Sequence, residues 1–149
     1  MSRDLKFRAY DSASGKVSEP FDVKESWGDY LIDFGDYSAD GALDSIIWEQ
    51  FTGLTDKNGK EIYEGDIVKQ LMYVLDGKKC TTTWVVRWNN DEFCYELHRV
   101  SGALYGDSML STCESKDCEV IGNIHEPPKD FRPEHLKRMG VSISKGGEE

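Results

Sequence analysis

Four cysteines, Cys80, Cys94, Cys113 and Cys118, are the first residues whose chemistry needs testing, because four thiolates can hold a tetrahedral zinc ion. Structural zinc sites usually present two close pairs of ligands, whereas only Cys113 and Cys118 lie close together in this sequence. The spacing therefore favours ordinary reduced thiols of a cytosolic protein over a zinc site. We predict no bound metal and no cofactor.

Histidine and serine residues do not form a complete catalytic set by their spacing. His98, His125 and His135 stand far apart, so no two imidazoles share a helical face. Residues 106–110 (Gly-Asp-Ser-Met-Leu) are similar to the nucleophile block of small esterases, in which a histidine must accept the serine proton. Those enzymes carry that serine near the chain start and a late Asp-x-x-His, which this sequence lacks. We therefore name no catalytic residue.

Acidic and aromatic residues crowd one segment, residues 19–49, which holds nine carboxylates against one base, Lys24. Five aspartates in it recur every three or four residues and would form one stripe on a helix, although Gly35 and Gly41 weaken a helix. Spaced negative charge and aromatic side chains could contact a basic protein surface, as a DNA mimic would. The candidate partner-binding residues are Asp29, Asp33, Asp36, Asp40, Asp44, Trp27 and Tyr37. The other interpretation, which the sequence favours, is a solvated acidic loop over the core.

Length and composition limit the class of protein. A chain of 149 residues is about one domain, and 38% hydrophobic with 31% charged residues is typical of a soluble globular protein. No apolar run approaches the roughly 18–20 residues of a membrane span, and the first residues lack the apolar stretch of a secretory signal. The net charge of −10 argues against non-specific binding to nucleic acid. We expect a cytoplasmic protein that does not bind membranes and has no non-specific affinity for nucleic acid.

Short strands separated by turn residues fill most of the chain. The first strand alternates Leu5, Phe7 and Ala9 with polar partners, which predicts a half-buried strand. Asn58-Gly59 gives the clearest hairpin turn, because both residues tolerate positive φ. Turns are also predicted at Asp76-Gly77 and after Asn89, with a strand of alternating side chains around Trp84 between them. Residues 24–44 are predicted to be mostly irregular. Further strands are expected near residues 17–23, 46–54, 62–68, 81–88, 93–100 and 119–124, with Phe93, Tyr95 and Leu97 on one face.

These elements predict a mainly β fold, a small barrel or sandwich-like antiparallel domain with a short C-terminal helix. An α+β fold is the alternative. Residues 1–130 are assigned to a single β-rich domain, and residues 131–149 to a short helix near residues 133–140 and a frayed tail.

Three sequence blocks, in order, resemble the YopX family of phage and prophage proteins. They are residues 5–10 (Leu-Lys-Phe-Arg-Ala-Tyr), 51–68 (from Phe-Thr-Gly-Leu-Thr-Asp to Glu-Gly-Asp-Ile-Val) and 119–126 (Glu-Val-Ile-Gly-Asn-Ile-His-Glu). The chain departs from that pattern at Tyr10, where the family often has tryptophan, and at His125, where tyrosine is common. The second block is the most specific. Its Gly-Asp-x-Val at 65–68 is also similar to a strand of small SH3-like barrels, which is an analogy of fold alone.

The resemblance implies a phage or prophage origin and a compact β-rich domain acting in a bacterial cytoplasm. It supplies no established catalytic residue, because the family lacks a settled biochemical role. We expect a non-enzymatic accessory protein that binds a protein of the host or the phage. Three alternatives stay open: an acidic decoy of a nucleic-acid-binding protein, a homo-oligomer, and a small enzyme acting on nucleic acid or a nucleotide in which the fold gathers Asp66, Asp107 and either His98 or His125.

Overall fold

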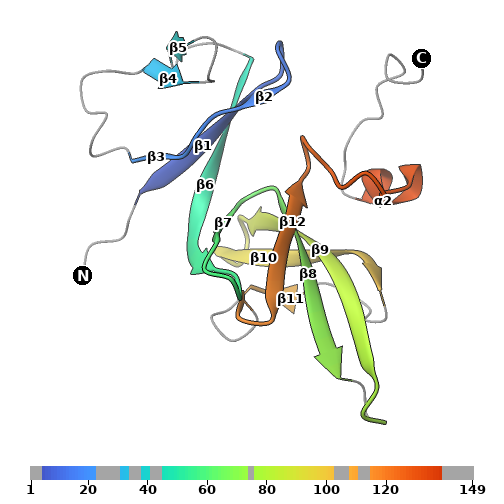
Figure 1. The fold of residues 1–149 in the computed structure, drawn as a ribbon. Helices are drawn as coiled ribbons and strands as arrows, with labels where there is room; N and C mark the ends of the chain where they lie inside the picture. Colours follow the sequence, from blue (N-terminus) through green and yellow to red (C-terminus); the bar gives the residue numbers. More distant parts are fainter. Residues whose placement is uncertain are drawn as a thin grey trace.

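Antiparallel β-strands make up most of the fold in the computed structural model, which describes residues 5–22, 31–33, 38–40, 45–73, 76–102, 108–110 and 115–138 (Figure 1). The strands in these ranges form two five-stranded sheets and one two-stranded sheet. The predicted mainly β class is therefore confirmed.

The first sheet is built around β1 (Lys6–Asp11). On one side β1 pairs with β2 (Lys16–Val17) and β3 (Phe21–Asp22), and on the other with β6 (Ile46–Thr55). In place of one strand near residues 17–23, the described residues form two short strands, with Pro20 between them. The break is expected because proline lacks the N–H that a continuous ladder needs.

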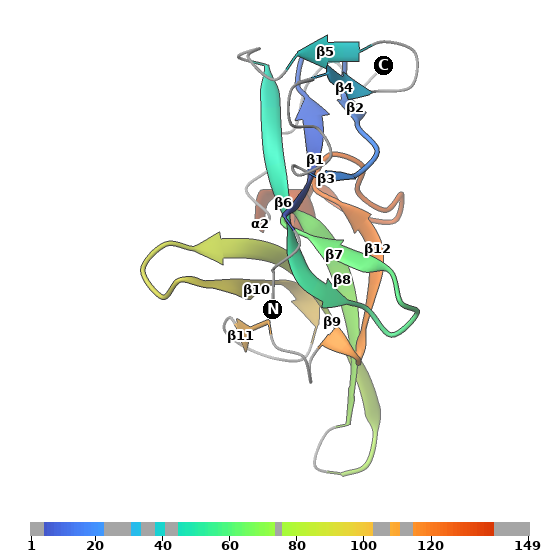
Figure 2. The same ribbon diagram turned by 90° about the vertical axis from the view of Figure 1, so that its left-hand side faces the viewer.

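The long strand β6 joins the two halves of the molecule (Figures 1 and 2). Its first half pairs with β1, and its second half pairs with β7 (Glu61–Tyr63) after a shift of register between Phe51 and Thr55. Gly53 lies in that irregular stretch with φ of +88°, a conformation that side-chain-bearing residues rarely adopt. The bulge lets one strand serve both halves.

The second sheet is a meander of β8 (Asp66–Tyr73), β9 (Lys79–Asn89) and β10 (Cys94–Gly102), with β11 (Ser108–Met109) beside β10 and β12 (Cys118–Asn123) beside β8. The turns at Asp76-Gly77 and after Asn89 follow the prediction. The expected continuous run over residues 62–68 does not form, because Gly65 turns the chain between β7 and β8 with φ of +85°.

Both faces of the second sheet carry apolar side chains. Trp84 and Val86 of β9 point into one buried cluster, which also contains Ile62, Val68, Tyr95, Leu97, Leu110 and Cys118. Val85, between them in the strand, belongs to a second cluster with Ile67 and Val100, against which Ile121, Ile124 and Phe131 pack. Successive side chains in the middle of β9 are therefore buried on opposite faces, as in a sheet that other segments cover on both sides.

Part of the segment predicted to be irregular forms a small hairpin. β4 (Leu31–Asp33) pairs with β5 (Ser38–Asp40), with Leu31 opposite Asp40 and Asp33 opposite Ser38. The prediction of mostly irregular structure was wrong for these six residues, because it weighed the flanking glycines above the apolar run at 30–32. The rest of the segment lies outside the described residues.

The last described element is a helix of six residues, α2 (Pro133–Arg138). Within the described part of the chain, no helix has the length and apolar character needed to cross a membrane. The division of the chain at residue 130 stays a prediction, and residues 139–149 lie outside the described ranges.

Asp56 holds the turn between β6 and β7 against β12. Its carboxylate accepts the N–H groups of Asn58 and Lys60 on Oδ1 and that of Val120 on Oδ2, each at 2.9 Å. Hydrogen bonds to a charged group contribute about 1.5–3 kcal/mol, and an amide cannot accept on both atoms. We predict that Asp56→Asn lowers the free energy of unfolding by about 2 kcal/mol in urea titrations. A change below about 0.5 kcal/mol would contradict this.

The effect of Asp56 should depend on pH. Burial acts to raise the pKa of this carboxyl group, but the hydrogen bonds from Val120, Lys60 and Asn58 outweigh it and hold the pKa below the ordinary value of 3.8. A pKa lowered by folding stabilises the protein above the unfolded pKa, and this stabilisation is lost as pH falls through the folded pKa. The stability difference between the wild type and Asp56→Asn should therefore narrow below about pH 4. A stability difference between the two proteins that stays constant from pH 7 to pH 2 would contradict the lowered pKa of Asp56.

Candidate functional site

Arg8 lies at the centre of a buried network of charged side chains. Its Nε donates to Glu49 Oε1 at 2.8 Å, its Nη1 donates to Asp66 Oδ1 at 2.6 Å, and its Nη2 donates to the carbonyl oxygen of Glu64 at 3.2 Å. The second oxygen of Glu49 contacts His125 Nε2 at 3.0 Å. None of these four charged or titratable side chains is more than 10% exposed. We call Arg8, Glu49, Asp66 and His125 the buried network.

The strand register brings these residues together. Arg8 and Glu49 are directly opposite in the ladder between β1 and β6, so their side chains project on the same side of the first sheet. Asp66 begins β8 immediately after the turn at Gly65, and His125 follows β12. One network thus joins the first sheet to the second.

His125 is also held by stacking. Its ring lies 3.7 Å from that of Tyr10, with 14° between the two planes. Tyr10 lies in the first of the three sequence blocks and His125 in the last. The stacked rings therefore form a direct contact between these two blocks.

Glycine is required at position 65 for two reasons. Its φ of +85° is costly for any other residue, and a β-carbon there would collide with Glu49 Oε2. The carboxylate of Glu49 can therefore take its place in the buried network only because residue 65 has no side chain.

Burial and mutual attraction act in opposite directions on the ionisation of the network. Burial alone lowers the pKa of Arg8, but Asp66 and Glu49 raise it above the ordinary value, so the guanidinium stays charged. Burial raises the pKa of Asp66, although Arg8 and the N–H of Tyr63 act against it. Burial and the neighbouring Glu49 also raise the pKa of Glu64, with Arg87 opposing. Ionising Asp66 is therefore costly even with the guanidinium of Arg8 beside it.

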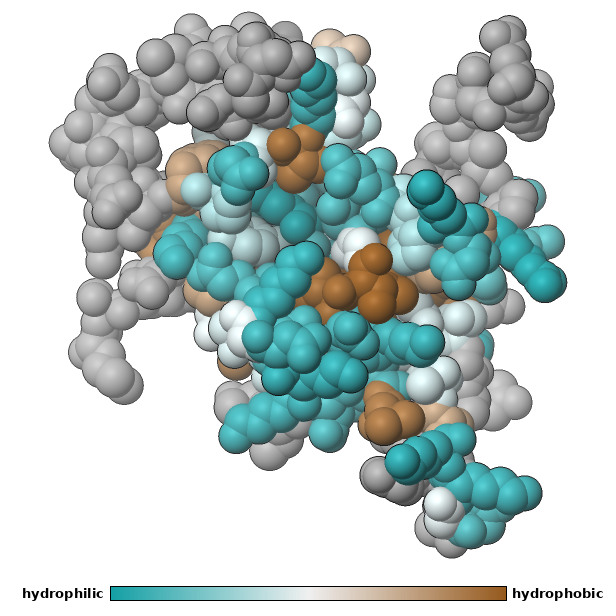
Figure 3. Space-filling model, viewed as in Figure 1, coloured by the Kyte–Doolittle hydropathy of each residue, from teal (hydrophilic) through white to brown (hydrophobic). Residues whose placement is uncertain are grey.

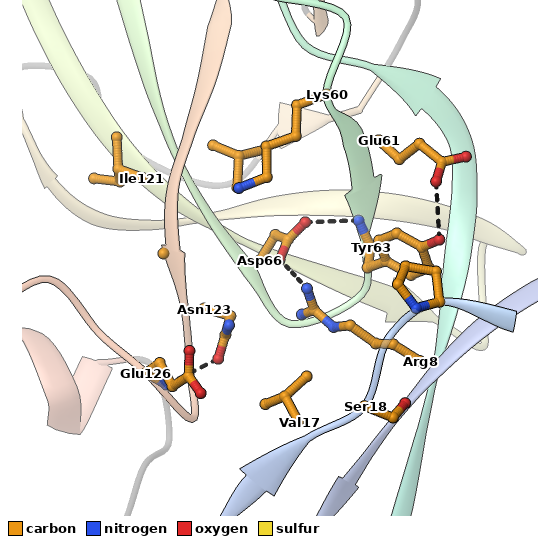
Figure 4. A pocket seen from close by; sticks show the side chains of 13 residues that line it. Arg8, Val17, Ser18, Lys60, Glu61, Tyr63, Asp66, Ile121, Asn123 and Glu126 are labelled. Atoms are coloured by element: carbon orange, nitrogen blue, oxygen red, sulfur yellow. Dashed lines mark hydrogen bonds and ion pairs between the residues drawn. The ribbon is translucent and has the colours of Figure 1, made fainter. Parts of the chain in front are cut away.

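A cavity of about 410 Å³ opens beside Arg8 and Asp66, between β2, β7 and β12 (Figure 4). In the space-filling view most of the described surface is hydrophilic, and an apolar patch lies over β12 (Figure 3). The lining of the cavity likewise combines polar and apolar residues. Its polar lining residues are Arg8, Ser18, Lys60, Glu61, Tyr63, Asp66, Asn123 and Glu126, and its other lining residues are Val17, Pro20, Val120, Ile121 and Gly122.

A second candidate region is the turn between β9 and β10, which projects from the body of the molecule (Figure 2). Phe93 in this turn is 79% exposed and has φ of 53°, the only positive φ among the described residues other than glycine. The prediction that Phe93 shares a face with Tyr95 and Leu97 was wrong, because the strand begins only at Cys94. Asp91 and Glu92 stand beside Phe93 in the turn.

Side-chain hydrogen bonds fix this turn. Asn89 Oδ1 accepts the N–H groups of Asp91 and Glu92 at 2.8 and 3.1 Å, and Asn89 Nδ2 donates to Glu96 at 2.6 Å. The Nε1 of Trp88 donates to Asn90 at 3.0 Å. We call residues 88–93 the aromatic turn.

The structure brings together part of the proposed enzymatic set. Asp66 and His125 meet through Arg8 and Glu49, whereas His98 contacts Glu96 on β10 and Asp107 lies outside the described residues. Both oxygens of Asp66 are engaged, one by Arg8 and the other by the N–H of Tyr63 at 2.7 Å. The contacts of Asp66 are therefore internal.

The remaining candidates are reported where the structure describes them. Among the described residues, Cys80, Cys94 and Cys118 form no disulfide, and no three His, Cys, Asp or Glu side chains gather to hold a metal ion. Ser108 lies in β11, and His135 lies in α2, where its Nδ1 accepts the N–H of Arg132. Cys113 is outside the described residues.

The acidic partner-binding candidates are described only in part. Asp33 ends β4 and Asp40 ends β5, so the backbone at these two positions is extended rather than helical. The other five lie outside the described residues: Trp27, Asp29, Asp36, Tyr37 and Asp44. Their role in binding a partner stays a prediction.

Sequence reasoning missed Arg8 and Glu49 as members of a site. Alternation in the first strand assigned Arg8 to the solvent face, but the side chains of Glu49 and Asp66 enclose it there. A signal was present, since Arg8, Asp66 and His125 each lie in one of the three blocks that resemble a known family.

Comparison with known proteins gives one family match that extends from the first of these blocks to the last. The family described as YopX protein matches residues 6–131. The chain belongs to the YopX family. This YopX chain is also similar to a solved structure, described as the crystal structure of protein EF1440 from Enterococcus faecalis, with 25% sequence identity and a TM-score of 0.45. The match covers 86% of this chain and 98% of that one. No curated protein matches the YopX chain.

Proposed function

We propose that this YopX protein is a non-enzymatic accessory protein of phage or prophage origin, which binds a protein partner in the bacterial cytoplasm through its aromatic turn. The observation that carries the proposal is Phe93, an aromatic side chain that is largely exposed on a projecting turn and held in a conformation unfavourable for its type. Strained and exposed residues of this kind cluster at binding sites.

The chemistry of the turn suggests the kind of partner. Phe93 offers an aromatic anchor, and Asp91 and Glu92 beside it add negative charge to a chain whose net charge is −10. Aromatic anchors carry much of the energy of protein interfaces, and charge complementarity raises association rates. The partner is expected to be a protein with an apolar pocket in a basic surface.

The hydrogen bonds of Asn89 reduce the entropy that binding would cost. A turn already held in one conformation loses little freedom when a partner covers it. The internal contacts of the buried network agree with a scaffold role for that part of the molecule.

The test is affinity capture from nuclease-treated bacterial lysate, with the tagged wild type compared with Phe93→Asn. Asparagine tolerates positive φ, so we expect this variant to unfold at the same urea concentration as the wild type or a higher one. It should nevertheless lose the captured partner. The matched control is Leu71→Asn on β8, which removes another apolar side chain that is 42% exposed and should retain the partner.

Recovery of the same proteins by Phe93→Asn and by the wild type would contradict the proposed function. Recovery of nothing except copies of this chain would contradict it as well, and would favour self-association.

A further inference from the structure

We propose that the cavity between β2, β7 and β12 binds a small zwitterion, an amino acid or short peptide with an apolar side chain. This site is separate from the aromatic turn. The cavity volume of about 410 Å³ is within the range of small-molecule sites, and its lining combines apolar residues with a few converging polar groups.

Hydrogen-bond donors without a partner converge on the cavity. Arg8 carries five N–H groups, of which three have acceptors within the protein, so two remain. Lys60 extends over the cavity from the β7 side, and no described residue accepts a hydrogen bond from its ammonium group (Figure 4). Asn123 uses its oxygen to accept the N–H groups of His125 and Glu126, which leaves its NH₂ group to donate. This surplus of donors fits a carboxylate.

The acidic residues of the lining are less available, with one exception. Glu61 is paired with Lys6 at 2.9 Å, and Asp66 is paired with Arg8. The carboxylate of Glu126 contacts no described donor and lies on the β12 side, across the cavity from Lys60 (Figure 4). A ligand that fits both ends would therefore place a carboxylate near Lys60 and an ammonium group near Glu126.

The apolar lining defines the remaining part of the ligand. Val17 and Pro20 supply apolar lining, so an aliphatic side chain held against them would leave water. L-leucine is a suitable probe, because it has the carboxylate, the ammonium group and an aliphatic side chain in one small molecule.

The test follows backbone amide signals of the full-length protein by NMR during titration with L-leucine up to about 20 mM, well above the 1 mM Kd that corresponds to weak binding. We expect saturable shifts at Ser18, Ile121 and Asn123. N-acetyl-leucine lacks the ammonium group and leucinamide lacks the carboxylate, so each should bind about tenfold more weakly, as expected when one charged contact is lost.

Two charge-removing variants test the ends of the cavity separately. Lys60→Gln and Glu126→Gln alter exposed side chains, and each should weaken L-leucine binding about tenfold. Lys69→Gln, an exposed position on β8, removes the same charge outside the cavity lining and should bind as the wild type does. The proposal is overturned if L-leucine produces no saturable shifts, if N-acetyl-leucine binds equally well, or if Lys60→Gln and Glu126→Gln bind as tightly as Lys69→Gln.

Discussion

Replacing Arg8 by methionine is expected to lower the free energy of unfolding by about 3–5 kcal/mol, measured by urea denaturation at pH 7.5. Methionine fills much of the same space but leaves Glu49 and Asp66 buried without their cation. Breaking a buried ion pair in this way is far more costly than losing a pair at the surface, because the remaining charge is not hydrated.

The matched control for Arg8→Met is Lys6→Met, two residues earlier on the same strand. Lys6 pairs with Glu61 at 2.9 Å, but about a third of each side chain is exposed. Such a pair contributes at most about 1 kcal/mol. Equal losses in the two variants would show that Arg8 has no special role in holding the sheets together.

A second substitution should relieve part of the damage in Arg8→Met. Adding Asp66→Asn removes one of the two stranded charges, while the amide oxygen can still accept the N–H of Tyr63. The double variant should therefore be more stable than the sum of the two single losses predicts. Strict additivity would contradict the coupling inferred from the 2.6 Å contact between Arg8 and Asp66.

The loss caused by Arg8→Met should also shrink in mild acid. Burial already raises the pKa of Asp66, and removing Arg8 takes away an influence that lowers it. A carboxyl group with a raised folded pKa binds its proton more readily in the folded state, so stability is regained as pH falls through that pKa. Unfolding at pH 5 and pH 7.5 should give a smaller loss at pH 5, and the opposite order would contradict the assignment.

Gly65→Ala is the second variant with a large expected effect, a loss of about 2–4 kcal/mol. About 1–2 kcal/mol comes from placing a side chain at φ of +85°. The rest arises because the new β-carbon must displace the carboxylate of Glu49, which Arg8 and His125 hold in place.

Gly59→Ala separates these two causes. Gly59 has a similar φ of +81°, but nothing lies within 4 Å of a β-carbon built there. Its loss should be limited to the backbone cost of about 1–2 kcal/mol. In addition, Glu49→Ala should make room for the alanine at 65. The double variant should therefore lose less free energy of unfolding than the two single variants lose together. Equal losses for Gly59→Ala and Gly65→Ala would contradict the steric explanation.

The sequence predicted the fold better than it predicted the site, for physical reasons. Asn58-Gly59 and Asp76-Gly77 set local turns, and the alternation around Trp84 depends on neighbours within the same strand. These signals are short-range, and the structure confirms them. Phe93 was misassigned because alternation continues through a turn in sequence, whereas its positive φ ends the strand before Cys94.

The buried network was not predictable from alternation, since its partners come from distant parts of the chain. Arg8 and Glu49 are 41 residues apart, and Glu49 and His125 are 76 apart. A polar residue that alternates with apolar ones along a strand normally faces water. Arg8 is buried instead by its contacts with Glu49, Asp66 and the ring of Tyr63. The resemblance to YopX proteins grouped the correct blocks but gave no contact between them.

The most direct test of the account is the affinity of the purified partner for the wild type, Phe93→Asn and Leu71→Asn, measured by calorimetry on proteins shown to be equally folded. We expect Phe93→Asn to bind at least about 30-fold more weakly, which corresponds to the loss of about 2 kcal/mol that defines a dominant interface residue. Leu71→Asn should bind within about twofold of the wild type. Equal affinity of Phe93→Asn and the wild type would contradict the proposal that this protein binds a partner through the aromatic turn.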